Sequence, residues 1–163
     1  MRLWHYADPS THGCFHYREA VPLLGLVQRG HTVHTSTDLS TCRLADWDAF
    51  LFARGYDLAQ HPDLPQLLAE LRDLAIPILY EVDDAMDLFP PWQVEYLAIQ
   101  RLLPTYYQLV HTADLVTTTT DWLAAHLRSL GARRVLVLPN TMTPAWKLKR
   151  PALHDGLRGV EHE

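Results

Sequence analysis

Acidic side chains gather near the end of one expected strand, residues 78–82. Glu81, Asp83, Asp84 and Asp87 form this cluster. Core packing does not explain carboxylates at a strand's carboxyl end, and mutual repulsion raises the pKa of the least solvated member toward that of a general base. We expect Asp83 or Asp84 to be catalytic, only one of them facing a ligand if the strand persists. Glu81 and Asp87 are candidate binding residues. The alternative is a solvated loop that caps a turn.

A turn with a glycine and two histidines follows the first expected strand. His12 and His16 are candidate hydrogen-bond donors to a ligand. Gly13 lets a ligand approach the backbone at a helix start, where amides favour anionic groups, and it serves equally well as a plain turn glycine. The sequence has no HExxH motif, and His31 and His34 face opposite sides of one strand. The histidines therefore predict no transition-metal site.

Hydroxyl and amide groups follow two further expected strands. The threonines at 117–120 serve first as a β-branched strand end with a helix N-cap, and second as a source of hydroxyls facing a ligand. Thr119 is the candidate binding residue among them. Asn140 comes after Pro139 at the end of the last expected strand and is a further candidate.

The sequence lacks the motifs of several common enzyme classes and metal sites. The sequence contains neither GxGxxG nor GxxxxGK[ST], which disfavours a nicotinamide dehydrogenase and a P-loop NTPase. Its two cysteines, Cys14 and Cys42, provide no disulfide framework and no CxxC metal knuckle. A hydrolase that uses Asp83, Asp84 and Asp87 to bind Mg²⁺ or Mn²⁺ stays open as an alternative.

Alternating strands and helices must position these residues. Short β-rich runs alternate with segments of helical period, which predicts an α/β fold: a doubly wound, mostly parallel Rossmann-like sheet with helices on both faces. The six expected strands are residues 3–6, 31–36, 48–53, 78–82, 115–119 and 134–138. Ligands bind at the carboxyl ends of such strands. Four segments therefore converge on one crevice: 8–14, 81–87, 117–121 and 139–141.

Two prolines fall inside expected helices. Pro22 either kinks its helix or lies in the first turn, and Pro104 must kink or split the helical region that follows Pro91. Strands and helices fill residues 1–145, which we expect to be one domain. Residues 146–163 lack a core-forming period and are expected to be a linker or tail.

Composition excludes several partners and locations. The chain has 163 residues, 48% hydrophobic and 20% charged, with a formal net charge of −5. That size suits one globular domain, and the negative charge argues against nucleic acid as a partner. No stretch is long and apolar enough for a bilayer span, and no signal peptide precedes the first acidic turn. We expect a cytoplasmic protein without a transmembrane segment.

Motifs in the second half of the chain resemble a known enzyme family. Residues 113–123 read ADLVTTTTDWL, followed by LGA at 130–132 and VLVLPN at 135–140. Further motifs lie in the stretch from Tyr17-Arg18 through Pro22, in RGHTV at 29–33 and in YEVDD at 80–84. Together they are similar to the retaining glycosyltransferases of the GT-B fold, the group-1 or GT4-like class. The similarity extends from Met1 to about Met142. The sequence departs from the family pattern at two places. It has Pro-Asn-Thr where Pro-Asn-Gly is usual in the family, and its first turn contains fewer glycines.

The resemblance implies the acceptor-binding, amino-terminal lobe of such an enzyme. Arg18, Glu81 and Asn140 then belong to the binding site, and a nucleotide-sugar is the co-substrate without any cofactor. Because the donor-binding lobe would follow Pro-Asn, we expect a half-enzyme or a truncated product, inactive in sugar transfer by itself. Its expected partners are a donor-binding lobe or further copies of the chain, and a sugar or glycoconjugate acceptor. The alternative is a non-catalytic sugar- or protein-binding module, because fold alone does not fix function.

Overall fold

One sheet of six parallel strands organises the chain. A computed structural model describes residues 1–7, 16–40 and 42–140. The strands are β1 (Arg2–Tyr6), β2 (Thr32–Thr35), β3 (Ala49–Ala53), β4 (Ile78–Glu81), β5 (Leu115–Thr118) and β6 (Val135–Val137). Their order is β2-β1-β3-β4-β5-β6, with every neighbouring pair parallel. This confirms the expected fold class, and all six carboxyl ends lie at one edge of the sheet.

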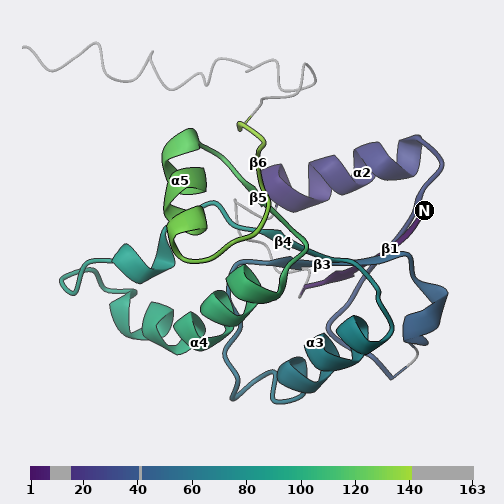
Figure 1. Cartoon of the computed structure of the whole chain (residues 1–163), viewed down its shortest axis with the longest axis horizontal. Helices are drawn as coiled ribbons and strands as arrows, with labels where there is room; N and C mark the ends of the chain where they lie inside the picture. The colour runs from purple at the N-terminus through teal and green to yellow at the C-terminus, as the bar shows by residue number, and fades with distance from the viewer. Residues whose placement is uncertain (8–15, 41, 141–163) are drawn as a thin grey trace, which may run out of the picture.

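Helices cover both faces of this sheet (Figure 1). They are α2 (Val21–Gln28), α3 (Leu64–Asp73), α4 (Tyr96–Thr112) and α5 (Asp121–Ser129), with the short turns η1 (His16–Ala20), η2 (Leu44–Asp46) and η3 (Met86–Leu88). Pro22 occupies the first turn of α2, one of its two expected placements. Pro104 lies inside α4, which continues to Thr112, so the expected alternative of a split helix is wrong.

The core is divided between the two faces of the sheet. Phe50 and Phe52 of β3 point to one face, where the leucines of α3 and the apolar sides of α4 and α5 pack. Ala49 and Leu51 point to the other face, where Leu23 of α2 packs. Side chains alternate across a strand, so a strand covered on both faces is apolar throughout, as residues 49–53 are.

The strand order determines where a ligand can enter. From β1 the chain passes to β2 on one side, and it then returns past β1 to β3 on the other side. The carboxyl ends of β1 and β3 therefore form the switch point of the sheet, where open parallel sheets bind ligands. From the sequence we expected the ligand crevice to be lined by the segments after β1, β4, β5 and β6. The sequence did not indicate that the segment after β3 also lines it.

Within the described segments, no helix combines the length and apolarity that a bilayer span requires. The expected tail at 146–163 and the domain boundary near Ala145 lie outside the described residues.

The end of β3 packs tightly against α4 at Gly55. A Cβ on Gly55 would lie 2.8 Å from Leu102 Cβ and 3.0 Å from the Leu102 carbonyl oxygen. Because Leu102 belongs to a helix packed on the core, we expect Gly55→Ala to lower the free energy of unfolding by about 1–3 kcal/mol. Chemical denaturation measures this change.

Gly25 in α2 provides the matched control. No atom lies within 4 Å of a Cβ built there. Since alanine is the better helix former, Gly25→Ala should raise the free energy of unfolding by about 0.5–1 kcal/mol. Equal effects of the two substitutions would contradict the close approach of Gly55 to α4.

Candidate functional site

A cavity of about 480 Å³ opens at the carboxyl ends of β1, β3 and β4. Its polar lining comes mainly from the segments that follow β3 and β4, and its apolar lining from η3, the segment after it, and α4. The lining includes Glu19, Arg54, Asp83, Asp84, Met86, Phe89, Ile99 and Leu102. This cavity occupies the switch point that the strand order defines.

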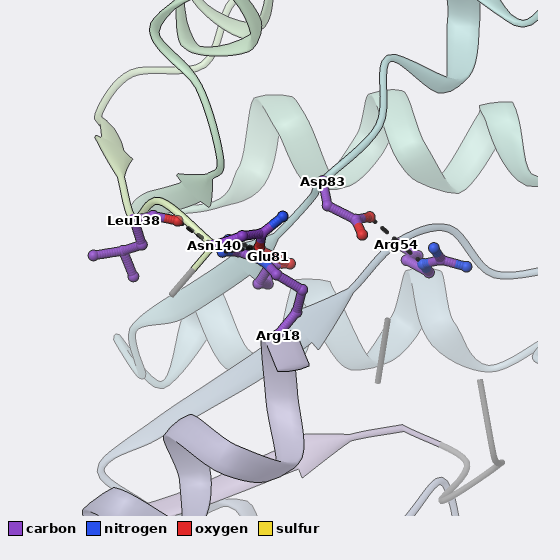
Figure 2. Close-up of polar contacts among 6 residues, drawn as sticks. All are labelled: Arg18, Arg54, Glu81, Asp83, Leu138 and Asn140. Atoms are coloured by element: carbon purple, nitrogen blue, oxygen red, sulfur yellow. Dashed lines mark hydrogen bonds and ion pairs between the residues drawn. The ribbon is translucent and has the colours of Figure 1, made fainter. Parts of the chain in front are cut away.

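Arg54 lines the cavity and lies beside two carboxylates. Its Nε lies 3.6 Å from Asp83 Oδ1, and its guanidinium Nη2 lies 3.7 Å from Asp84 Oδ2. Figure 2 shows the Asp83 carboxylate directed toward Arg54. The two aspartates follow β4 and Arg54 follows β3, so neighbouring strands bring the three charges together.

The backbone of Arg54 is strained. Its φ is 59°, in the left-handed region that non-glycine residues rarely adopt. The Arg54 N–H donates to the Glu81 carbonyl oxygen at 2.9 Å, which holds this conformation at the end of the strand pair. Such a conformation costs about 1–3 kcal/mol and is concentrated at functional sites. The residue in this conformation lines the cavity.

The two aspartates differ in environment. The Asp83 side chain is 13% exposed, and the Asp84 side chain is 63% exposed. Partial burial and the negative charge of Asp83 raise the pKa of Asp84, and Arg54 opposes that rise. Asp84 is thus the more accessible carboxylate, with its proton affinity increased by its surroundings.

Glu81 and Arg18 pair with each other beside the cavity. Arg18 Nε donates to Glu81 Oε1 at 2.7 Å, and an Nη2 contact to the same oxygen completes the ion pair. Arg18 Nη1 also donates to the Leu138 carbonyl oxygen at 2.7 Å and to Asn140 Oδ1 at 3.2 Å (Figure 2). The pair therefore ties η1 and β4 to the segment after β6.

Burial governs the charge of Glu81. Its pKa is raised from 4.5 to about 7, chiefly by desolvation. The Arg18 charge and hydrogen bonds oppose this rise, and the charges of Asp83 and Glu19 add to it. Both side chains are nearly buried, at 8% and 7% exposed. A buried pair of this kind is a structural contact whose disruption leaves an uncompensated charge.

Asp87 makes contacts of its own. Its two carboxylate oxygens each lie 3.0 Å from His126 Nε2, and Tyr106 OH donates to Oδ1 at 3.4 Å. The Asp87 side chain is only 8% exposed and does not line the cavity. It connects η3 to α4 and α5.

The other binding residues predicted from the sequence follow β5, begin η1 or lie outside the described residues. Thr119 directly follows β5 and is half-buried, and Thr120 caps α5 by accepting a hydrogen bond from Leu123 N at 3.1 Å, as expected for this threonine run. His16 begins η1. His12 and Gly13 lie outside the described residues. Across the described segments, no three His, Cys, Asp or Glu side chains are grouped as a metal ion requires.

Sequence reasoning missed Arg54 and Glu19. Arg54 directly follows the most apolar strand of the chain, so the rule that selected Asp83 after β4 applies equally to the end of β3. No sequence signal distinguishes Glu19 from an exposed helix glutamate.

Known proteins provide no assignment. No protein-family model, curated protein or solved structure matches this chain. The cavity and the motif resemblance are therefore the features that point to a function.

Proposed function

We propose that this chain is the acceptor-binding half of a glycosyltransferase of GT-B type, and that the cavity binds a hydroxyl-rich sugar or glycoconjugate. The observation that carries this proposal is the position of Arg54 beside the adjacent carboxylates of Asp83 and Asp84, in a cavity at the switch point of the sheet. The motif resemblance supplies the reaction class. A nucleotide-sugar is the proposed donor, presented by a second lobe or a partner.

The lining suits a polyhydroxylated ligand. Carboxylates accept hydrogen bonds from hydroxyl groups, and a guanidinium donates several in a fixed geometry. Met86, Phe89, Ile99 and Leu102 add apolar surface on which the C–H groups of a sugar ring can pack. Ligand pockets commonly combine such an apolar wall with a few well-placed polar groups.

The proposed mechanism assigns separate roles to the charged groups. Asp84 accepts the proton of the acceptor hydroxyl or orients it. Arg54, which is paired with Asp83, donates a hydrogen bond to the oxygen of that hydroxyl. Charge on the leaving diphosphate is stabilised by cationic and amide donors of the second lobe, and transfer uses no cofactor.

The test of this proposal is sugar binding by the purified chain. Saturation-transfer NMR with a panel of methyl glycosides should show binding, and Arg54→Gln should weaken it by about tenfold or more, since hydrogen bonds to charged groups contribute about 1.5–3 kcal/mol. Arg72→Gln, an exposed residue of α3, is the matched control and should bind as the parent does. Absence of glycoside binding by the parent chain would contradict the proposal.

The ion pairs of Arg54 favour a second candidate, a non-catalytic binding module. Proximity to a guanidinium favours the charged form of a carboxylate and weakens it as a base. Such a module would bind glycosides and lose binding in Arg54→Gln, yet it would support no transfer when the donor lobe and nucleotide-sugar are supplied.

A further inference from the structure

A buried carboxylate on η1 also lies in the cavity wall. Glu19 of η1 lines the cavity, although the residue is only 6% exposed. Its Oε2 lies 2.8 Å from Nε2 of His5, a residue of β1 that is fully buried. Nδ1 of His5 lies 3.3 Å from Thr35 Oγ1. A chain of polar contacts thus leads from β2 through β1 to the cavity wall.

The short helix η1 holds this carboxylate firmly. It is a π-helical turn, a rare structure that is frequent at functional sites. Arg18 and Glu19 are consecutive and make different buried contacts: Arg18 with Glu81 of β4, and Glu19 with His5 of β1. Two buried contacts therefore fix the turn against two strands.

Burying a carboxylate is costly unless it is well compensated. Core packing alone would be better served by an apolar residue at position 19, since replacing buried ionic groups with apolar ones is often neutral or stabilising. Glu19 instead combines a histidine partner with a place in the lining of a cavity. A carboxylate in this position can accept a hydrogen bond from a ligand in the cavity.

We propose that Glu19, oriented by His5, is a specificity-determining residue that accepts a hydrogen bond from one hydroxyl of the ligand. This inference rests on the proposed function, because the ligand class is the sugar proposed above. Glu19, on η1, accepts a hydrogen bond from one hydroxyl of the ligand. Arg54, Asp83 and Asp84 contact another part of the same ligand. His5 is a positioning residue that contacts Glu19.

Three variants separate these roles. Glu19→Gln exchanges a carboxylate oxygen for an amide group and should lower the affinity for the methyl glycoside bound by the parent by about tenfold. His5→Gln retains an N–H donor near the position of Nε2 and should preserve affinity, whereas His5→Leu should lose affinity as Glu19→Gln does. Far-ultraviolet circular dichroism and thermal unfolding verify folding.

Deoxy glycosides provide the decisive readout. The analogue that lacks the hydroxyl bound by Glu19 should bind to the parent and to Glu19→Gln with equal affinity, a result that a general structural defect would not produce. If His5→Leu fails to fold, the comparison of Glu19→Gln with His5→Gln still decides whether Glu19 contacts the ligand. Unchanged affinity in Glu19→Gln would overturn the role of Glu19 and leave the proposed function intact. Absence of glycoside binding by the parent would overturn both.

A ligand-free measurement tests the positioning contact by itself. For His5 to donate to the Glu19 carboxylate oxygen 2.8 Å away, its Nε2 must carry the proton, because a bare imidazole nitrogen accepts a hydrogen bond and cannot donate one. Nitrogen NMR of the His5 imidazole should report a protonated Nε2 in the parent chain. A bare Nε2 would overturn the proposed orientation of Glu19 by His5.

Discussion

Replacing Arg18 with methionine is expected to lower the free energy of unfolding by about 3–5 kcal/mol, because it leaves the Glu81 carboxylate buried without its cation. Arg18 also donates to the Leu138 carbonyl oxygen and to Asn140 Oδ1, so the substitution releases the end of the sheet beyond β6. Chemical denaturation at neutral pH measures the loss. Arg72→Met, exposed on α3, controls for the chemistry of the substitution and should change stability little.

The effect of Arg18→Met should depend on pH. The pKa of Glu81 is about 7 in the folded chain and 4.5 ordinarily, so the folded state binds this proton more tightly. The tighter proton binding by folded Glu81 therefore adds to the free energy of unfolding. This contribution is fully present below pH 4.5 and is lost as the pH rises through about 7. Removing Arg18 raises that pKa further, so the deficit relative to the parent should be larger near pH 8 than near pH 5.

A double variant tests the electrostatic cause. Arg18→Met combined with Glu81→Leu removes both charges from the buried site and should recover much of the lost stability, as apolar replacement of buried ion pairs often does. A double variant as unstable as Arg18→Met alone, at every pH, would show that the loss comes from packing rather than from the unpaired carboxylate.

The fold was predictable because its signals are local. The apolar run 49–53 and the leucines of α3 repeat with the periods of a buried strand and an amphipathic helix, and the structure has both. Pro104 shows the limit of this reasoning. A proline disfavours a helix interior, but packing of Tyr106, Leu109 and Val110 in the core holds α4 together around it.

The site was less predictable because its geometry is not local. Arg18 and Glu81 were each expected to bind substrate, and the structure pairs them with each other across 63 positions of sequence. The placement of β3 next to β1, which makes Arg54 a cavity residue, depends on strand order rather than on any local pattern. The acidic segment after β4 was identifiable because its residue types alone were unusual for a strand end.

Asp84→Asn is expected to lower turnover by about 100-fold in the chain supplied with a donor-binding lobe and a nucleotide-sugar, if Asp84 is the general base. Asp84 is the candidate base because its side chain is more exposed than that of Asp83 and because its own pKa is raised from the ordinary value. The amide keeps the shape of the side chain, so KM for the acceptor should change less than kcat. Asp73→Asn, exposed at the end of α3, is the matched control and should retain the parent rate.

The pH profile of turnover distinguishes a base from a residue that only shapes the cavity. The rate should fall at low pH as Asp84 is protonated, because only its charged form accepts a proton. The Asp83 charge raises the pKa of Asp84, so Asp83→Asn should move this acidic limb to lower pH. Arg54 lowers the same pKa, so Arg54→Gln should move the limb to higher pH. If the Asp83 and Arg54 variants shift the acidic limb of the pH profile in opposite directions, the group that titrates in this limb must lie near both residues, as Asp84 does. An acidic limb that stays in place in both variants, or an Asp84→Asn variant with the parent kcat, would remove Asp84 from the chemistry and favour the non-catalytic binding module.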